Sequence, residues 1–455
     1  MFTYVKARNF KSLKEIEFNL NKTKNKINPL VVVYGENGSG KTNLVELFQV
    51  LKKSLIARCM VPIVETEWKV WGGEIKENFE EIQMVEESAE PYQPDWRIAT
   101  ELQRYRMIGE KDPTELEFGF QINGIDGFYA FKFTDEVIEE SLYYKVDKQR
   151  AYFYQLKKEE GKITKKLNQN IFPNSKYREE LYESIEQYWG KYTFLSLLMA
   201  EKRDKNREYI ENNIASNIFE VTKMFLSMIV QESERKIQSG QPNRKATLRN
   251  IQRGEIREDK LSEIRKYETI LNIFFTQAYA DIKQVKYLTR RDEGRVSYRL
   301  YFEKMIGGKL KSIPSTSESE GTQRILRQFN TLVGALTGET VIIDEIDNGI
   351  HDVLMKNIVL SIQDEITGQL IVTTHNTLLL EVLPKEYLYI LSTDYKGNKE
   401  IQSIKEYDIK VQKNHNARDL YLKGIFGGIP TTEYIDFEEI KDTLDDWKET
   451  NGEEA

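Results

Sequence analysis

The sequence contains little cysteine and histidine and no long apolar segment. Its 455 residues include one cysteine, Cys59, and three histidines. A single cysteine excludes an internal disulfide framework and is typical of a reducing compartment. No run of about 18 apolar residues occurs, which excludes a membrane-spanning helix, and residues 1–6 enter a strand pattern that leaves no room for a signal peptide. We therefore expect a cytoplasmic protein with no membrane partner.

Acidic residues exceed basic ones mainly in the segment 431–455. This segment holds ten acidic and two basic side chains, a net charge of −8, whereas the whole chain carries −7. Overall charge therefore neither favours nor excludes a nucleic-acid partner. Phe437, Ile440, Leu444 and Trp447 recur every three to four residues and predict a helix with one apolar face. Two interpretations stay open: the helix docks on a basic surface, either residues 235–266 of a neighbouring subunit or an effector protein, or it packs on its own chain.

The most specific motif is a glycine-rich loop at residues 35–42, which read GENGSGKT. It follows an apolar run and precedes an amphipathic stretch, which is the strand, loop and helix context of a phosphate-binding loop. Its glycines let successive N–H groups curl around phosphate oxygens, and the helix start adds unpaired donors. We expect Lys41 to bind the β- and γ-phosphates and the Thr42 hydroxyl to bind Mg²⁺. The predicted nucleotide-binding residues are Gly35, Glu36, Asn37, Gly38, Ser39, Gly40, Lys41, Thr42 and Asn43.

A second apolar run, residues 340–343, ends in two carboxylates, Asp344 and Glu345. Such a run is typical of a buried central strand whose last residues emerge at the edge of the sheet where ligands bind. We expect Asp344 to hold Mg²⁺ through its water shell. Glu345 is expected to accept a hydrogen bond from the attacking water and to act as general base.

Two further segments supply candidate site residues. Residues 369–374 predict another buried strand, and a parallel arrangement would bring His375 to the same edge, facing the γ-phosphate; alternatively, this histidine only closes the strand. Ser319 stands where the cap of a helix over 324–336 is expected, and Gly321 leaves backbone N–H groups open to an anion. Taken alone, the Ser319 segment reads as an ordinary helix cap.

The remaining pattern predicts an α/β protein built from both ends of the chain. Residues 2–20 predict a hairpin, and 115–120 with 128–133 predict an antiparallel pair joined by a turn at Asn123-Gly124. A helical period starts near residue 175, and two apolar seams, around 214–228 and 261–278, predict two helices packed on each other. Strands resume at 282–287 and 296–302. The expected parts are 1–150 (N-terminal part of the head), 151–281 (helical insertion), 282–405 (C-terminal part of the head) and 406–455 (C-terminal segment with acidic tail).

Together these segments resemble the ABC-type ATPase head that is shared by structural-maintenance-of-chromosomes (SMC) and overcoming-lysogenization-defect (OLD) ATPases. The nearest likeness is to the compact bacterial AAA family ATPases of the RloA type, which belong to anti-phage defence loci. The resemblance covers roughly residues 1–150 and 280–430, and the residues that carry it are 9–12 (NFKS), 35–42, 318–322 (ESEGT), 344–347 (DEID) with Ile350-His351, 373–375 (TTH), 421–424 (YLKG) and 426–430 (FGGIP).

The resemblance implies that ATP is sandwiched between two subunits, with Ser319 and Gly321 of one copy binding the γ-phosphate held by the other. A homodimer or higher homo-oligomer is therefore expected. The signature reads Ser-Glu-Gly-Thr where the transporter pattern is Ser-Gly-Gly-Gln. The residue that senses Mg²⁺ in such heads stays open between Gln149, Gln155 and Glu201.

Three functions follow as alternatives. In the first, the chain is the ATPase sensor or scaffold of an anti-phage defence complex; because the sequence after His375 is too short for a fused nuclease domain, a separate effector such as a nuclease is expected. In the second, it is a DNA-repair or chromosome-type ATPase that clamps DNA directly. The candidate DNA contact is residues 235–266, which carry ten basic and four acidic side chains. The ordinary interpretation of this stretch is a solvated helix face. In the third, slow hydrolysis makes assembly the main output.

Overall fold

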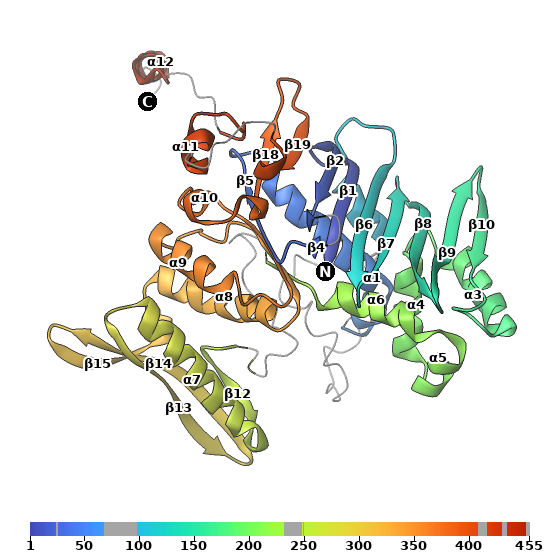
Figure 1. Ribbon diagram of the computed structural model, residues 1–455, viewed down its shortest axis with the longest axis horizontal. Coiled ribbons are helices and arrows are strands. Elements are labelled where there is room, and N and C mark those ends of the chain that lie inside the picture. Colours follow the sequence, from blue (N-terminus) through green and yellow to red (C-terminus); the bar gives the residue numbers. More distant parts are fainter. Residues whose placement is uncertain are drawn as a thin grey trace.

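The computed structural model describes residues 1–23, 26–67, 98–231, 248, 250–407, 416–429 and 435–451 (Figure 1). Within these residues the strands form a six-stranded, a seven-stranded, a four-stranded and a two-stranded sheet. The two-stranded sheet consists of β3 (Asn21–Thr23) and β4 (Lys26–Ile27), and three short helices are α2 (Ile98–Gln103), α10 (Leu379–Val382) and α11 (Ala417–Leu422).

The six-stranded sheet carries the predicted nucleotide-binding strands. Its order is β11 (Ile229–Gln231), β16 (Thr340–Ile343), β17 (Gln369–Thr373), β5 (Leu30–Tyr34), β18 (Leu388–Thr393) and β19 (Lys399–Ser403). All pairings are parallel except that of β18 with β19. Every residue of β5, β16 and β17 is buried, because helices cover both faces of a parallel sheet. Burial on both faces explains why these strands are continuous apolar runs in the sequence, and their assignment as central strands is confirmed.

The seven-stranded sheet is antiparallel throughout and stands beside the first sheet (Figure 1). Its order is β10 (Lys162–Leu167), β9 (Gln149–Glu159), β8 (Val137–Val146), β7 (Ile125–Phe133), β6 (Thr114–Ile122), β1 (Phe2–Phe10) and β2 (Leu13–Asn19). The predicted hairpin over 2–20 and the pair joined at Asn123-Gly124 are therefore confirmed. Asn123 adopts φ 52° and Gly124 φ 76°, the left-handed angles that a two-residue hairpin turn requires.

The predicted helical insertion differs from the structure at its start. The boundary expected at residue 151 falls inside β9, so the segment begins with two strands of the seven-stranded sheet. Helices follow: α3 (Ser175–Tyr188), α4 (Phe194–Asp204), α5 (Arg207–Asn213) and α6 (Ser216–Ser227). The helical onset near residue 175 is confirmed.

The predicted packing of two helical seams on each other is wrong. Ile218 and Val221 of α6 lie in the core shared with the seven-stranded sheet. Ile264 and Leu271 of α7 (Leu261–Ala278) lie in a second core, against β13 and β14. An apolar seam specifies that a helix face is buried but not which surface buries it.

Strands 282–287 and 296–302 exist but belong to a separate sheet. β13 (Ile282–Asp292) and β14 (Arg295–Ile306) pair with each other, and β14 also pairs with β12 (Arg253–Arg257) and β15 (Lys309–Pro314). α7 covers one face of this four-stranded sheet. From β15 the chain enters α8 (Glu320–Leu336), and α9 (Asp352–Ile362) lies next to α8 (Figure 1).

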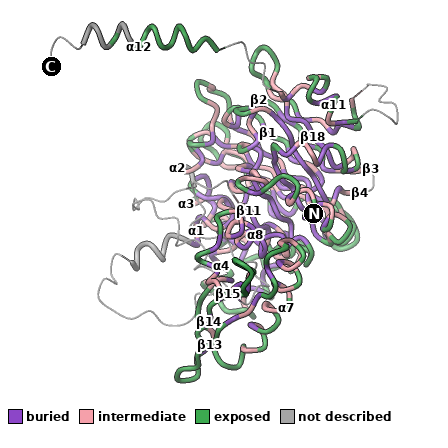
Figure 2. The backbone as a smooth tube through the Cα atoms, turned by 90° about the vertical axis from the view of Figure 1, so that its left-hand side faces the viewer, coloured by how far each residue is buried: buried purple, intermediate pink, exposed green. Residues whose placement is uncertain are grey.

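Helix α12 (Phe437–Asn451) projects away from the body of the protein (Figure 2). Residues 431–434 and 452–455 of the acidic segment lie outside the described residues. Among the described helices, none combines the length and the apolar character that crossing a membrane requires.

Candidate nucleotide-binding site

The glycine-rich loop joins β5 to α1 (Lys41–Glu67), which begins at the motif's lysine. Gly38 and Gly40 have φ of 80° and 104°, angles that a side chain strongly disfavours. The Lys41 ammonium donates to the carbonyl oxygens of Gly35, at 2.8 Å, and of Glu36, at 3.0 Å. The loop therefore curls around the head group of its own lysine, as a phosphate-binding loop does.

Burial lowers the pKa of Lys41, and the carboxylates of Asp344 and Glu345 act in the opposite direction. The ammonium is thus desolvated but lies among negative groups that favour its charged form. The Ser39 hydroxyl is buried and has no hydrogen-bond partner among the described residues. A loop with a buried ammonium and an unused hydroxyl fits an anion such as a phosphate.

The end of β16 and the start of α1 meet at one carboxylate. The Thr42 hydroxyl donates to Oδ2 of Asp344 at 2.9 Å, and the Thr373 hydroxyl donates to Oδ1 at 2.6 Å. Asp344 and Thr42 lie 302 positions apart in the sequence. A threonine hydroxyl beside a carboxylate is a donor set that suits Mg²⁺, which binds protein oxygens and keeps its remaining ligands from water and phosphate.

Glu345 lies at the same edge with an unusual backbone. Its φ is 51°, in the left-handed region that few residues other than glycine and asparagine adopt. Its N–H donates to the Thr373 hydroxyl at 2.7 Å, and the Asn348 amide donates to its carboxylate at 3.3 Å. Backbone strain at a carboxylate between two motifs is a feature of functional sites.

His375 follows β17, which lies between β16 and β5, so the predicted adjacency is present. Its backbone N–H donates to Asp347 Oδ2 at 3.2 Å. Partial burial and the positive charge of Lys41 lower the pKa of His375 below 6.5, while Asp347 and Asp344 act in the opposite direction. The imidazole is therefore neutral at pH 7.

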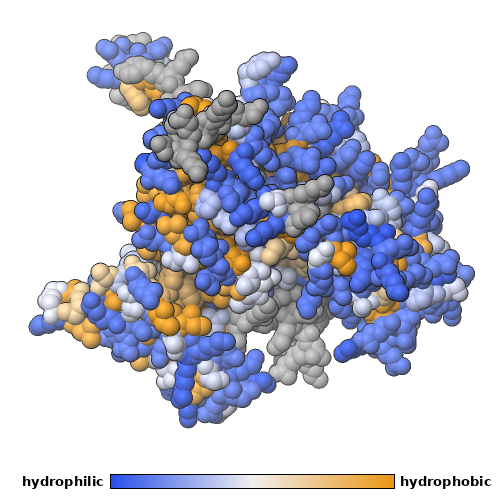
Figure 3. All heavy atoms as spheres, viewed as in Figure 1, coloured by the Kyte–Doolittle hydropathy of each residue, from blue (hydrophilic) through white to orange (hydrophobic). Residues whose placement is uncertain are grey.

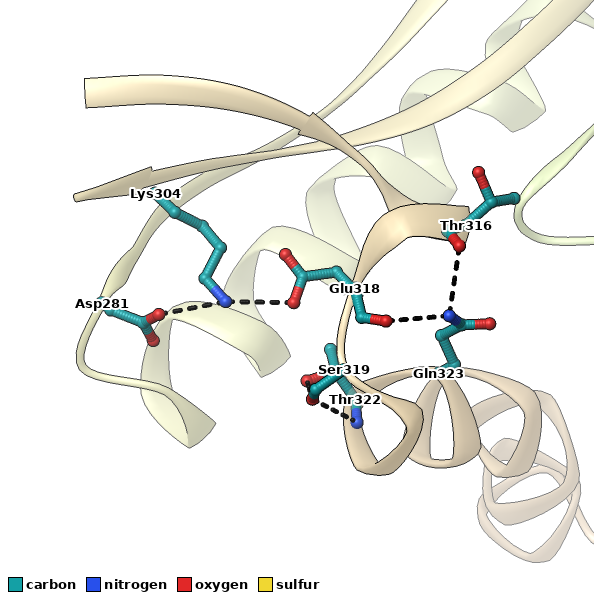
Figure 4. A network of polar contacts seen from close by, with 7 residues as sticks. All are labelled: Asp281, Lys304, Thr316, Glu318, Ser319, Thr322 and Gln323. Carbon is teal, nitrogen blue, oxygen red and sulfur yellow. Dashed lines mark hydrogen bonds and ion pairs between the residues drawn. The ribbon is translucent and has the colours of Figure 1, made fainter. Parts of the chain in front are cut away.

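The signature segment is a helix cap held from behind by an ion-pair network (Figure 4). The Thr322 N–H donates to the Ser319 hydroxyl at 3.3 Å, which confirms the predicted cap. Behind it the buried Glu318 carboxylate pairs with Lys304 at 3.0 Å, and Lys304 pairs with Asp281 at 3.0 Å. Ser319 itself is exposed and therefore open to a second molecule.

The Gln323 amide of α8 also holds the signature segment through hydrogen bonds. It donates to the carbonyl oxygens of Thr316, at 3.2 Å, and Glu318, at 2.9 Å. Lys304 lies on β14 and Asp281 directly precedes β13, so the four-stranded sheet holds the base of the signature. The sequence offered no signal for this contact, because it joins residues from three separate elements.

The signature helix also contacts the turn that follows Glu345. Arg324 Nη1 donates to Asn348 Oδ1 at 3.1 Å, and the Gln328 amide donates to the Ile346 carbonyl at 3.2 Å. A Cβ at Gly321 would lie 3.1 Å from the Gly349 carbonyl oxygen, so glycine permits this close approach. Asn348 thus links α8 to the Glu345 carboxylate, a connection that the sequence analysis missed.

Residues far along the chain support the glycine-rich loop. A Cβ at Gly428, whose φ is 69°, would lie 3.5 Å from Gly35 Cα and 2.8 Å from Ile390. The Tyr421 hydroxyl donates to the Gly428 carbonyl at 2.8 Å, and its ring contacts that of Tyr34 at 5.7 Å between centroids. Segments 421–424 and 426–429 therefore pack against the start of the glycine-rich loop.

The three candidates for the Mg²⁺-sensing residue lie on other elements. Gln149 and Gln155 belong to β9, which three strands separate from β1 in the seven-stranded sheet, and Glu201 belongs to α4. Burial raises the pKa of Glu201. Within the described part of the chain, no contact joins any of the three to Thr42 or Asp344.

Comparison with known proteins identifies the family. The family model described as "AAA domain, putative AbiEii toxin, Type IV TA system" matches residues 30–381, more than three quarters of the chain. No curated protein matches the sequence. Three solved structures are similar: an SMC head bound to the C-winged helix domain of ScpA, the SMC head domain from Thermotoga maritima, and the SMC head domain with an extended coiled coil from Pyrococcus furiosus.

These structures are 13%, 12% and 12% identical to the chain, with TM-scores of 0.42, 0.36 and 0.38. The matches cover 88%, 88% and 89% of this chain and 97%, 98% and 97% of those chains. Because the TM-scores are low, the family match carries the assignment. The chain belongs to the family of AAA domains with this description, and its α/β fold is that of a P-loop ATPase head.

Proposed function

We propose that the chain binds ATP with Mg²⁺ and hydrolyses it at a site completed by a second copy. The observation that carries this proposal is the hydrogen bond of 2.9 Å between Thr42 and Asp344, which joins the glycine-rich loop to the end of β16. Thr42 and Asp344 would hold Mg²⁺, which when bound neutralises charge on the phosphates. Lys41 would bind the β- and γ-phosphates.

Glu345 would act as general base toward water, oriented by the Asn348 amide and by Thr373. His375, neutral at pH 7, would donate or accept a hydrogen bond near the γ-phosphate. The exposed Ser319 and the adjacent Gly321 would bind the γ-phosphate that the second copy holds. The firm attachment of their loop to the four-stranded sheet supports this role, since a preorganised donor stabilises a charge best.

Two substitutions test the assignment of the site. Lys41→Ala removes a positive charge from the phosphates, so ATP affinity should fall about a hundredfold or more. Glu345→Gln keeps the shape of the side chain but removes the base, so ATP should bind and persist while hydrolysis is lost. Binding is measured with a fluorescent ATP analogue and hydrolysis by phosphate release. Equal loss of nucleotide binding in both variants would contradict the assignment.

A third substitution tests the contribution of the second copy. Ser319→Arg places a bulky cation at the exposed cap, so ATP should still bind to the single chain but no longer induce association. Mixing Ser319→Arg with Lys41→Ala subunits should restore one composite site and part of the hydrolysis. If the Ser319→Arg protein associates with ATP as well as the unaltered chain does, the sandwich arrangement is wrong.

We further propose that the chain is the sensor or scaffold subunit of a bacterial anti-phage defence complex of the RloA and OLD type, with a separate effector such as a nuclease. The description of the matched family, a putative toxin of a type IV TA system, supports a role in such a locus. Co-purification from its native host, followed by a nuclease assay with and without ATP, tests this role. An ATPase that recovers no second protein in either condition would contradict it.

The second candidate is a chromosome-type ATPase that clamps DNA directly. It is supported by the basic stretch over 235–266, which carries ten basic and four acidic side chains. Of the basic residues in that stretch, Arg235, Lys236, Arg244, Lys245 and Arg249 lie outside the described residues. ATP-dependent retention on circular DNA that linearisation abolishes would favour this candidate over the first.

A further inference from the structure

Helix α12 presents an apolar face that its own chain leaves exposed. The side chains on this face are 44% to 70% exposed: Phe437, Ile440, Leu444 and Trp447, with Ile435 just before the helix at 60%. Figure 2 shows the helix standing clear of the body. Large apolar side chains gathered on one exposed helix face mark a surface that binds another molecule. Every described side chain of α12 is exposed, which favours docking on another molecule over packing on its own chain.

The outer face of the four-stranded sheet carries side chains that are complementary to those of α12. Residues that lie directly opposite each other on paired strands point to the same face of the sheet. Tyr298, Leu300 and Phe302 of β14 are buried in the core that includes α7, so they define the inner face. The outer face therefore carries the alternate residues. Those with exposed positive side chains and no ion pair among the described residues are Arg253, Arg290 and Arg299.

Arg253 and Arg299 stand directly opposite each other on β12 and β14. Like charges at opposed positions of an antiparallel pair are destabilising. By contrast, the neighbouring Arg295 on the same face pairs with Glu255 at 3.2 Å. Two arginines held together without a carboxylate are suited to an anionic partner.

The same face also exposes apolar side chains. Leu288 is directly opposite Arg299, and Met305 is directly opposite Leu310 at the end of the β14–β15 hairpin. Their exposed fractions are 51%, 41% and 57%. Figure 3 shows apolar residues at this hairpin, at the left of the view. The outer face is thus basic and apolar together.

We propose that α12 of one copy of the chain docks on this outer face of a second copy. Residues 435–451 carry seven acidic and two basic side chains, a net charge of −5, and residues 250–314, which form the four-stranded sheet together with α7, carry fourteen basic and nine acidic ones, a net charge of +5. Each combines its charge with exposed apolar side chains. A nucleic acid would use the arginines but would leave Leu288, Met305 and Leu310 uncovered, so an acidic amphipathic helix fits the surface better.

The short segment that precedes α12 favours docking on a second copy over docking on the same chain. Only five residues join Ile429 to Ile435, a span of about 20 Å at full extension. In Figure 1, α12 lies at the top left and the four-stranded sheet at the bottom left, with α8, α9 and α10 between them. Docking between copies would join the four-stranded sheet, which holds the signature segment, to its neighbour. The proposal does not depend on ATP hydrolysis.

Cross-linking of the full-length chain tests the contact. One tagged variant carries Leu444→Cys and an untagged one carries Leu288→Cys, and the mixture is treated with a short bis-maleimide. Burial raises the pKa of the native Cys59 thiol to about 11, so this residue contributes little background. We expect a mixed dimer whose yield is at least tenfold above that of a matched control with Ile108→Cys, a 99% exposed position elsewhere, in place of Leu288→Cys.

Charge reversal tests the complementarity. Arg253→Glu, Arg290→Glu and Arg299→Glu together should lower the cross-linking yield about tenfold, and combining them with subunits carrying Glu438→Lys, Glu439→Lys and Asp442→Lys should restore it. Reversal of three exposed lysines on the strands or turns of the seven-stranded sheet, Lys145, Lys148 and Lys162, is the matched control and should leave the yield unchanged.

Three outcomes would overturn the proposal. One is a cross-link that forms only within a chain carrying both cysteines, since the helix then folds back on its own copy. Another is a yield equal to that of the Ile108→Cys control. The third is a reversal of the three arginines that leaves the yield unchanged but removes binding of a double-stranded DNA probe, since the face then serves a nucleic acid. Lys41→Ala subunits should cross-link normally, which separates this result from a failure of the ATP site.

Discussion

Two carboxylate sites of this protein, one in each large sheet, are built in opposite ways. Glu140 of β8 is fully buried and accepts five hydrogen bonds. Their donors are the hydroxyls of Tyr129 (3.1 Å) and Tyr154 (2.8 Å), the indole of Trp189 (2.8 Å), and the N–H groups of Phe194 (2.7 Å) and Leu195 (3.3 Å) at the start of α4. Asp344 and Glu345 receive hydroxyl and amide donors at the edge of their sheet, and Glu345 has a strained backbone.

The difference separates a carboxylate that is part of the core from one that we propose to be functional. Around Glu140 the chain supplies every donor itself, and burial, which raises the pKa of this carboxyl, is countered by those donors. Around Asp344 the donors come from the glycine-rich loop and from β17, and the Lys41 ammonium donates to carbonyl oxygens of its own loop. A carboxylate that is fully buried and fully hydrogen-bonded stabilises the fold, whereas one at the carboxyl edge of a parallel sheet lies where ligands bind.

Removing the structural carboxylate should have the largest effect. Glu140→Ala leaves five buried donors without their acceptor, and each such group costs about 1–3 kcal/mol when it finds no other partner. We expect a loss of about 4 kcal/mol or more in the free energy of unfolding, measured by urea denaturation. Glu345→Gln is the matched control at the other site and should change it by less than about 1 kcal/mol. Similar losses in the two variants would remove the distinction.

Next in size is the hydroxyl that joins the two site carboxylates. Thr373→Val removes the donor to Asp344 and the acceptor of the Glu345 N–H while keeping the shape of the side chain. Loss of such a supporting contact costs about 10- to 100-fold in activity. We expect kcat for ATP hydrolysis to fall by that factor with a smaller change in ATP affinity. An unchanged kcat would show that Thr373 only completes the strand.

A smaller loss is expected from the link between α8 and Glu345. Asn348→Ala removes both the amide that donates to Glu345 and the oxygen that accepts from Arg324. One charged hydrogen bond is worth about 1.5 kcal/mol, or roughly tenfold in rate. We expect kcat to fall about tenfold while ATP binding by the single chain stays the same. Asn348→Asp, which keeps the acceptor but repels Glu345, should be no better than alanine.

A gain in stability is expected where the backbone of the candidate site is strained. Glu345→Asn replaces a residue held at φ 51° by one that adopts left-handed angles more readily. The free energy of unfolding should rise by about 0.5 kcal/mol while hydrolysis is lost, as thermal unfolding and phosphate release would measure. A destabilised variant would indicate that contacts of the Glu345 side chain outweigh its backbone strain.

The smallest effect concerns pH. Because the pKa of His375 is lowered below 6.5 in the folded protein, the unfolded chain binds more protons in the interval between the lowered pKa and 6.5. The free energy of unfolding therefore falls as the pH drops through this interval. His375→Gln should flatten that dependence in urea denaturation series, with little change above pH 7. An identical slope in the variant would place the titrating group elsewhere.

Much of the candidate nucleotide site was predictable from short motifs. A glycine-rich loop between a strand and a helix has one main use, and apolar runs ending in Asp344-Glu345 and before His375 have to be buried parallel strands. Ser319 as a helix cap follows from residue type and position alone. The contacts of Thr373, Asn348 and Lys304 were not predictable, because each depends on which strand or turn lies beside it in space.

The sequence by itself determined the local elements: the hairpin over 2–20, the central strands, the helix starts and the acidic amphipathic face of α12. Each of these depends on periodicity, capping or turn chemistry within a few residues. Only the tertiary structure decided that α6 and α7 belong to different cores, that residues 282–314 form a separate sheet, and that this sheet holds the signature through Lys304 and Glu318. The physical reason is that an apolar face or a charged side chain specifies the kind of partner it needs, whereas the packing of the whole chain selects which one it meets.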